Sequence, residues 1–446
     1  MVRNQAAGPS FGVNTSSHPD EIPALVFADS RGNIIDYPEL SMAGAAAMEI
    51  RPLRPEELIP LPPGSELFIL PGRLPVGIDP LTGQPAPLAE NPYDGAAGIQ
   101  AVAAFMAPAH TAIYTAAFVK AQDSVPLLPL FAYTAVGWYQ GKFWVAALRS
   151  DADRRQDYDQ FDQDTIRQMT RQALETGRNN RLIRHLGHCC LVYGCPAARN
   201  YFLHRWEAPL PTSPACNASC LGCISLQPSG CCPATQERID FVPSVEEIVE
   251  IGVEHLLRAE NAVISFGQGC EGEPLLQADT IEAAIRAIRR RTPAGTVNLN
   301  TNGSRPDAVG RLADAGLDSI RISMNSARRD FHHRYYRPRG FDFVDVLESI
   351  SAMKARGRFV SLNYFILPGF TDDPAEFEAL CNLIDQRKPD LIQLRNLNMD
   401  PHWYLQGVDF VPSGAPLGIT RWLASLRRRF PGLGFGYFNP ALGKRG

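Results

Sequence analysis

Three cysteines stand close together in the middle of this chain, at Cys216, Cys220 and Cys223, with the spacing C-x3-C-x2-C. Soft thiolates suit iron–sulfur clusters and zinc. Three of them so near in sequence can hold one face of a cube-shaped cluster and leave one iron without a protein ligand. An iron with a vacant position can chelate the amino and carboxylate groups of a small molecule, as catalytic metal centres do. A structural zinc site is the alternative interpretation.

Polar residues that can bind a small ligand follow the predicted strands downstream of the triplet. Glycine lets backbone carbonyls approach a ligand closely, and a carboxylate offers charge-assisted hydrogen bonds to an ammonium group. Amide and hydroxyl groups at strand ends can bond a ribose or a carboxylate. Turns and helix caps are the alternative use of such residues. The candidates are Gly272, Glu273, Pro274, Asn300, Thr301, Ser323 and Asn325.

Further cysteines flank the triplet and form a second group of possible metal ligands. A disulfide scaffold spreads its cysteines over a small chain, whereas this chain concentrates nine of ten between Cys189 and Cys270, which favours metal ligation. Packing as small buried hydrophobes fits them equally well. Cys270 itself can be a ligand, a hydrogen-atom donor or a loop filler. The candidates for an auxiliary metal site are Cys189, Cys190, Cys195, Cys231 and Cys232.

Arginines near two predicted strand ends are candidates for binding an anionic substrate. The segment 327–339 mixes cations and aromatic residues and includes Arg334, Arg337 and Arg339. Arg395 lies among polar residues at the end of the sixth predicted strand. Guanidinium groups bind carboxylates and phosphates well, although a solvated charged face is the more common use of such a segment.

Strands and helices alternate from about residue 206 onward, and these elements must position the candidates. Repeated strand–helix units predict parallel strands with right-handed crossovers, in an open doubly wound sheet or a partial barrel, with the chemistry at the carboxyl ends of the strands. The predicted strands are 202–208, 262–266, 296–301, 319–324, 360–367 and 391–397. The predicted helices are 244–258, 279–291, 305–315, 342–356, 374–387 and 416–429.

Three regions precede or contain these units. Residues 1–150 are rich in Pro and Gly with short apolar runs, which predicts a β-rich accessory domain with hairpin turns at 30–33 and 139–142. Residues 151–205 are a Cys-containing connecting region, with a helix-like stretch at 162–176 and a hinge at 188–200. Residues 206–446 hold the strand–helix units and a C-terminal extension.

Composition narrows the functional classes. The net charge of -4 and pI ≈ 6.2 give no electrostatic case for bulk nucleic-acid binding. The first residues lack the apolar core of a signal peptide. The charge-poor stretch 96–119 contains Gln100, Pro108 and His110 and is mostly alanine, so we interpret it as buried globular structure rather than a membrane span. We expect a cytoplasmic protein.

Residues 206–400 resemble the radical S-adenosylmethionine (SAM) superfamily, because the triplet follows the first strand and Glu271-Gly-Glu-Pro274 is similar to the family's Gly-Gly-Glu-Pro motif. Gly222 departs from the aromatic residue usual before the third cysteine. The resemblance implies an α/β fold, a partial (β/α)6 TIM-type barrel. It also implies a [4Fe–4S] cluster on the triplet, SAM as cosubstrate, and a reducing partner such as flavodoxin or ferredoxin. Ile366 and Gly369 would pack against adenine.

The activity that the resemblance implies is reductive cleavage of SAM to a 5′-deoxyadenosyl radical, which abstracts hydrogen from a substrate. A peptide or protein and a small cofactor precursor fit equally well as that substrate. Several branches of the superfamily carry auxiliary clusters, which the additional cysteines can provide. Two other classes stay open: a structural iron–sulfur or zinc-binding interaction protein, and a radical enzyme that modifies RNA.

Overall fold

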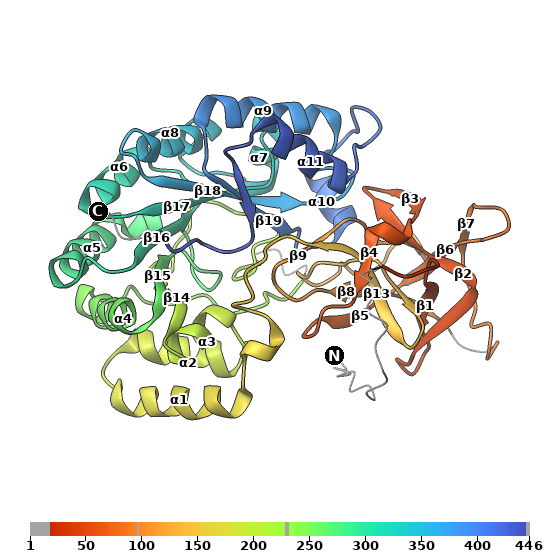
Figure 1. The fold of residues 1–446 in the computed structure, drawn as a ribbon, viewed down its shortest axis with the longest axis horizontal. Helices are drawn as coiled ribbons and strands as arrows, with labels where there is room; N and C mark the ends of the chain where they lie inside the picture. The colour runs from red at the N-terminus through yellow and green to blue at the C-terminus, as the bar shows by residue number, and fades with distance from the viewer. Residues whose placement is uncertain (1–17, 96–97, 228–231, 443–446) are drawn as a thin grey trace. The chain divides into compact units, whose positions relative to one another are not determined.

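The computed structural model describes residues 18–95, 98–227 and 232–442 (Figure 1). The chain forms two compact units. One unit contains residues 1–152, 365–378 and 395–429, and the other contains residues 153–364, 379–394 and 430–446. Among the helices in the described ranges, none combines the length and the apolar character needed to cross a membrane.

The N-terminal region is β-rich, as its short apolar runs predicted. Its antiparallel strands form one 13-stranded sheet with the central order β11-β6-β2-β1-β12-β13-β4. The strands are β1 (Ala24–Ala28), β2 (Ile34–Ala46), β3 (Glu49–Pro52), β4 (Leu58–Pro60), β5 (Glu66–Leu70), β6 (Arg73–Ile78), β7 (Pro85–Pro87), β8 (Gln100–Phe105), β9 (His110–Ala112), β10 (Thr115–Ala116), β11 (Phe118–Lys120), β12 (Val136–Tyr139) and β13 (Lys142–Arg149).

Both predicted hairpin turns are present. The Asp29 carboxylate accepts hydrogen bonds from the backbone N–H groups of Arg31 (2.9 Å) and Asn33 (2.8 Å), and Gly32 takes the positive φ of +85° that the β1–β2 turn needs. Tyr139 pairs with Lys142 across the β12–β13 turn. Within the stretch 96–119, the described residues form the short strands β8 to β11, most of them buried.

A fully buried ion pair lies inside the first unit. The Arg73 guanidinium on β6 donates to the Asp400 carboxylate at 2.5 Å, and each side chain is only 1% exposed. Arg73 also donates to the carbonyls of Pro71 and Pro126, while Asp400 accepts the N–H of Leu128. The additional hydrogen bonds compensate much of both buried charges, and among the described residues only Arg73 Nε of this pair is left without a partner.

The second sheet has seven parallel strands in the order β14-β15-β16-β17-β18-β19-β20 and forms a half barrel. The strand–helix pattern predicted six parallel strands in an open sheet or a partial barrel, the resemblance implied the partial barrel, and the short strand β20 was not predicted. Helices α4, α5, α6 and α8 cover its outer side (Figure 1). The strands are β14 (Arg205–Pro209), β15 (Glu260–Phe266), β16 (Thr296–Thr301), β17 (Ser319–Met324), β18 (Phe359–Ile366), β19 (Leu391–Asn396) and β20 (Gly434–Gly436).

The predicted helices after residue 206 all form, with ends shifted by at most a few residues. Ser244 caps α4 through a capping box with Glu247. These helices are α4 (Val245–Arg258), α5 (Ala278–Arg291), α6 (Pro306–Ala315), α8 (Phe343–Lys354), α9 (Pro374–Arg387) and α11 (Ile419–Arg429). Two short helices were not predicted: α7 (Arg329–Tyr336) and α10 (Pro401–Gly407).

The connecting region is more helical than the sequence suggested. The helix predicted at 162–176 is α1 (Gln163–Thr176), with Asp162 as its N-cap. The expected hinge at 188–200 is wrong, because it lies in α2 (Arg181–Leu191) and α3 (Pro196–Phe202), with a short turn between them. The predicted strand 202–208 begins later for the same reason, since Phe202 ends α3. Leu182, Ile183 and Leu186 bury one face of α2.

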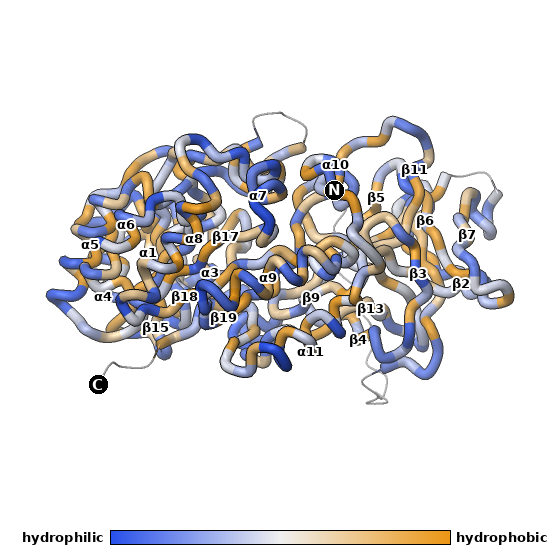
Figure 2. The backbone as a smooth tube through the Cα atoms, turned by 90° about the horizontal axis from the view of Figure 1, so that it is seen from above, coloured by the Kyte–Doolittle hydropathy of each residue, from blue (hydrophilic) through white to orange (hydrophobic). Residues whose placement is uncertain are grey.

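Side chains alternate across the parallel strands. Even-numbered residues of β17 and β18 are apolar and buried, whereas Arg321 and Ser323 pair in register with Ser361 and Asn363 on the opposite face. The inner face of the half barrel is therefore lined by amides, hydroxyls and a guanidinium. Hydrophilic and hydrophobic residues likewise alternate along the outer helices, and α7 is mostly hydrophilic (Figure 2).

Candidate metal centre

The cysteine triplet lies in an irregular loop after β14 and before α4, at the carboxyl end of the first parallel strand. All three side chains are half-buried. Burial, followed by the negative charge of Glu273, raises the pKa of Cys216 to about 11. Burial, with the neighbouring thiols, also raises the pKa of Cys220. Both groups are neutral thiols unless a cation compensates the charge of their thiolates.

Arg238 is a functional candidate that sequence reasoning missed. Its Nη2 atom donates to Cys223 Sγ at 3.4 Å, and its Nε atom donates to Ser225 Oγ at 3.1 Å. The guanidinium also favours the thiolate forms of Cys216 and Cys220. One signal was available in the sequence, because Arg238 is the first basic residue after the triplet.

The Gly-Glu-Pro loop after β15 rests directly on the cysteine loop. Gly272 N donates to the Ser213 carbonyl at 2.6 Å, and Glu273 N donates to the Ala215 carbonyl at 2.8 Å. A Cβ atom at position 272 would stand 1.9 Å from Ala215 O, which no side chain can tolerate. In this structure the glycine is required by the backbone that leads into Cys216.

Two buried carboxylates hold these loops together. Glu271 accepts hydrogen bonds from the backbone N–H groups of Thr212 (2.8 Å), Ser213 (3.0 Å) and Gln268 (2.6 Å). The Glu273 carboxylate instead accepts hydrogen bonds from the N–H of Asn302 at 2.8 Å and from the Thr301 hydroxyl, at the end of β16. Burial raises the pKa of each carboxyl to about 7. Pro274 is buried and opens the 3-10 turn that follows.

Helix α7 supports the cysteine loop from another side. Ser219 N and Leu221 N donate to the carbonyls of Tyr336 (2.9 Å) and Tyr335 (3.0 Å) at the end of the helix. Arg339 donates through its backbone to the Asn217 carbonyl and through Nη2 to Ser219 Oγ at 2.6 Å. Arg337 ends the helix in the left-handed conformation. The segment 327–339 thus braces the triplet.

The remaining predicted ligand contacts lie along the inner face of the half barrel and just beyond it. Asn300 Nδ2 donates to the Gly267 carbonyl at 2.8 Å, and Asn325 Nδ2 donates to the Phe331 carbonyl at 3.1 Å. Ser323 pairs in register with Asn363, whose buried Oδ1 has no hydrogen-bond partner among the described residues. The sequence analysis did not select Asn363, although it lies two residues after Ser361 and therefore on the same face of β18. In the other unit, Ile366 is buried at the end of β18, and Arg395 is the penultimate residue of β19.

Among the described additional cysteines, Cys189 belongs to a compact group of possible metal ligands. Cys189 on α2 lies beside Cys270 and beside His185, whose Nε2 is 3.6 Å from Cys189 Sγ. Its neighbour Cys190 points elsewhere and contacts Thr170 Oγ1 at 3.3 Å. Burial raises the pKa of Cys195, at the start of α3, to about 11. Cys232 is buried, and Cys231 falls outside the described residues.

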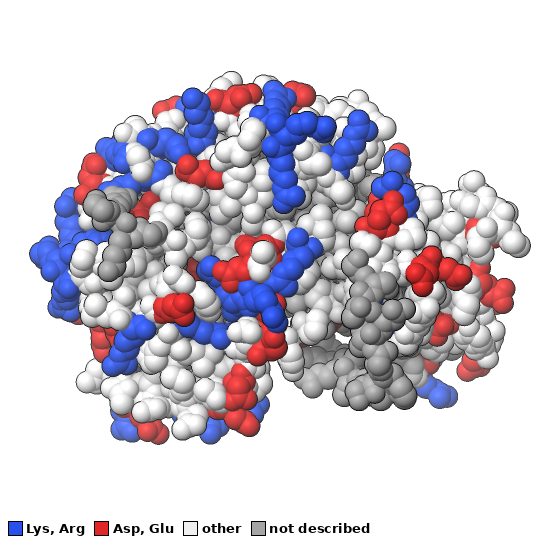
Figure 3. Space-filling view, in the orientation of Figure 1, with Lys and Arg blue, Asp and Glu red and all other residues white. Residues whose placement is uncertain are grey.

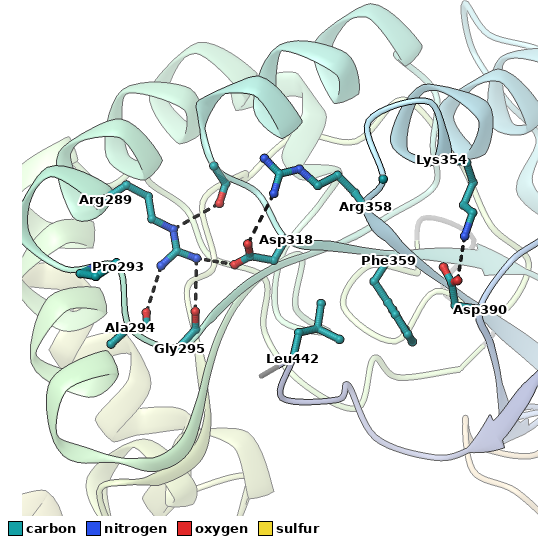
Figure 4. Close-up of a pocket in the computed structure, with 12 residues that line it drawn as sticks. Arg289, Pro293, Ala294, Gly295, Asp318, Lys354, Arg358, Phe359, Asp390 and Leu442 are labelled. Carbon is teal, nitrogen blue, oxygen red and sulfur yellow. Dashed lines mark hydrogen bonds and ion pairs between the residues drawn. The ribbon is translucent and has the colours of Figure 1, made fainter. Parts of the chain in front are cut away.

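A cavity of about 780 Å³ lies at the opposite, amino-terminal edge of the parallel sheet (Figure 4). Its charged side chains are paired with one another. Arg289 donates to Asp318 and to the carbonyls of Ala294 and Gly295, and Lys354 donates to Asp390 at 2.7 Å. These ion pairs therefore lie at the amino-terminal ends of the parallel strands.

Part of the chain is similar to a known family and to two curated proteins. Residues 210–383 match the family model described as the radical SAM superfamily. The FeMo cofactor biosynthesis protein NifB of Klebsiella pneumoniae is 25% identical over 36% of this chain and 37% of its own length. The probable dual-specificity RNA methyltransferase RlmN 1 of Opitutus terrae is 30% identical over 47% of this chain and 62% of its own length. The chain thus spans about a third to two thirds of these relatives.

Among solved structures, the crystal structure of HydG, a maturase of the [FeFe]-hydrogenase, covers 61% of this chain and 56% of its own at 17% identity and a TM-score of 0.36.

Proposed function

We propose that this chain, a member of the radical SAM superfamily through residues 210–383, reductively cleaves SAM at a [4Fe–4S] cluster held by Cys216, Cys220 and Cys223. The observation that carries the proposal is that three thiols share one irregular loop at the carboxyl end of the first parallel strand, braced from two sides. Ligand sites of parallel α/β sheets lie at this edge.

The donor set fits an iron–sulfur cluster. Thiolates are the ligands that such clusters take, and the loop supplies three from eight consecutive residues. Arg238 donates to Cys223 Sγ, and hydrogen bonds to cluster sulfurs raise the reduction potential by stabilising the more negative state.

When bound, the cluster supplies an electron to the sulfonium of SAM, which yields methionine and a 5′-deoxyadenosyl radical that abstracts hydrogen from the substrate. The chain's own residues hold and orient the participants. Glu271 and Gly272 fix the backbone before Cys216, and α7 fixes the backbone between the cysteines. Asn363 Oδ1, which has no hydrogen-bond partner within the described ranges, offers an acceptor on the inner face for the ribose or the amino group of SAM.

The side chains that line the inner face of the half barrel are compatible with more than one class of substrate. Ser323 and Asn363 offer neutral hydrogen-bonding groups, which fit a peptide as well as a small polar cofactor precursor. The NifB relative is named for the biosynthesis of a cofactor. A small reducing protein such as flavodoxin or ferredoxin is proposed as the electron donor.

Anaerobic reconstitution tests the proposal. The protein is loaded with iron and sulfide, reduced with dithionite and incubated with SAM, and 5′-deoxyadenosine and methionine are quantified by chromatography. We expect both products from the wild type and neither from the Cys216/Cys220/Cys223→Ser triple variant. Loaded protein that binds zinc alone, or that releases no 5′-deoxyadenosine, would instead identify a structural metal-binding protein.

An RNA substrate is the second candidate, and the RlmN 1 relative is the observation that favours it. The basic segment 328–339 gives it little support, because Arg329 pairs with Asp342 and Arg339 bonds Ser219. Lysine and arginine are interspersed with acidic residues on the face shown in Figure 3. RNA binding that weakens steeply between 50 and 200 mM salt would favour this candidate, and no measurable binding would remove it.

A further inference from the structure

His185, Cys189 and Cys270 form a compact group apart from the cysteine triplet. One nitrogen and two sulfurs, all potential metal ligands, lie within 4.8 Å of one another. His185 and Cys189 are four residues apart on α2, so they share one face of the helix. Cys270 comes from the loop after β15. Cys189 and Cys270 are 2% and 6% exposed, and His185 is half-buried.

The separation of His185 Nε2 and Cys189 Sγ matches a single tetrahedral ion. With Zn–S near 2.3 Å and Zn–N near 2.05 Å, the nitrogen and sulfur ligands of one tetrahedral zinc stand about 3.6 Å apart. The observed separation of His185 Nε2 and Cys189 Sγ is 3.6 Å. The ring of His185 is also held edge-on against Phe241, which fixes its orientation.

We propose that His185, Cys189 and Cys270 bind one Zn²⁺ ion, a second metal site distinct from the cluster. Binding displaces the two thiol protons to solvent, and no redox step is involved. Cys195, whose backbone N–H donates to the Cys189 carbonyl at 3.0 Å, is the neighbouring thiol that can supply a fourth ligand. Cys190 is not a ligand, because it faces Thr170 on the other side of α2.

The proposed zinc anchors the loop on which the cysteine triplet rests. Cys270 directly precedes Glu271 and Gly272, which bond the backbone at Thr212 and Ser213 just before Cys216. Helix α2 is independently fixed to α4, because Arg181 forms an ion pair with Glu247 at 2.7 Å and Asn180 bonds Glu250 at 2.9 Å. An ion between α2 and Cys270 therefore ties the loop to a rigid support.

Cobalt titration tests the site without depending on SAM cleavage. The full chain carrying Cys216, Cys220 and Cys223→Ser cannot hold the proposed cluster, so any tetrahedral site it retains is separate from it. Kept reduced with a phosphine, it should bind one Co²⁺ with the visible bands of tetrahedral thiolate–cobalt, and Zn²⁺ should displace the cobalt. We expect Cys189→Ser and Cys270→Ser to weaken binding at least 10-fold, and Cys190→Ser to leave it unchanged.

Other outcomes overturn the proposal. These are the absence of tetrahedral bands in the parent protein, their retention in Cys270→Ser, their loss in Cys190→Ser, and a Cys189–Cys270 disulfide that persists in the reductant. Because Cys270 is buried, its replacement can disturb folding, which circular dichroism detects. His185→Asn, on the half-exposed side of the group, then gives the same comparison, and unchanged cobalt affinity in that variant would equally reject the site.

Discussion

The two edges of the parallel sheet use polar residues in opposite ways. At the amino-terminal edge, Arg289, Asp318, Lys354 and Asp390 satisfy one another and nearby backbone around a large cavity. At the carboxyl edge, polar side chains bond the backbone of a loop that presents three thiols, and Asn363 keeps an acceptor without a partner among the described residues. The comparison teaches that the cavity at the amino-terminal edge is lined by paired charges, whereas the edge proposed for the chemistry presents three thiols and an acceptor without a partner among the described residues.

The strongest way to break this comparison is to remove one thiol at the carboxyl edge. Cys220→Ser should lower 5′-deoxyadenosine formation at least 100-fold, because a hydroxyl is a poor ligand for iron. Product release after anaerobic loading measures the effect. Arg289→Ala serves as the control from the other edge, and equal losses in both variants would contradict the assignment of chemistry to one edge.

A backbone contact gives the next largest effect. Gly272→Ala places a methyl group 1.9 Å from the Ala215 carbonyl, so the cysteine loop must shift. Overpacking of this kind typically costs about 2 kcal/mol, and we expect iron content to fall several-fold. Iron analysis and thermal unfolding check this. Gly432→Ala is the exposed control for adding a methyl group, since its Cβ would meet nothing within 4 Å and its φ is not positive.

At the amino-terminal edge we expect a stability effect with no specific effect on chemistry. Arg289→Ala removes the ion pair with Asp318 and hydrogen bonds to three carbonyls, which should cost about 2 kcal/mol. Denaturant unfolding measures this loss, and 5′-deoxyadenosine formed per cluster should stay unchanged. Reduced turnover per cluster would show that the amino-terminal edge takes part in the reaction.

The smallest expected effect is on the stability of the fold at acidic pH, through His255, whose side chain contacts the start of β14. Burial lowers the pKa of His255 to about 4, although its Nε2 bonds the Trp206 carbonyl. Between pH 6.5 and 4 the unfolded chain takes up a proton that the folded chain refuses, so stability falls as pH decreases through this window. At pH 5.5 the loss is about 1.2 kcal/mol relative to neutral pH. His255→Gln should lose less stability than the wild type over the same pH range, and an identical loss in both would contradict the assignment.

Sequence periodicity predicted the regular elements of the second sheet well. The strands Thr296–Thr301 and Ser319–Met324 have the predicted bounds, because buried apolar residues alternate with polar ones and turn residues flank them. The segment at 188–200 misled the prediction, since cysteine and glycine masked the apolar face of α2. Helix α7 was missed because its aromatic and basic residues carry little helical periodicity.

The sequence singled out many of the residues that form the candidate site, but it did not predict their contacts. Spacing singled out the triplet and the Gly-Glu-Pro loop, but only the structure shows that Glu271 and Arg339 brace the cysteine loop. Contacts between residues far apart in the sequence are not visible in its hydrophobic periodicity. The spacing of His185 and Cys189 was a usable signal, since residues four apart on a helix share a face.

The buried pair of Arg73 and Asp400 has a consequence for shortened chains. A chain begun at residue 153 would keep the carboxylate and lose the Arg73 guanidinium, together with the Leu128 amide that also bonds it. An uncompensated buried charge typically costs about 3–5 kcal/mol, comparable to the whole stability margin of many proteins. The residues that precede the parallel sheet in sequence therefore act as an internal scaffold for residues 395–429, and excising them would leave that part of the chain prone to unfolding.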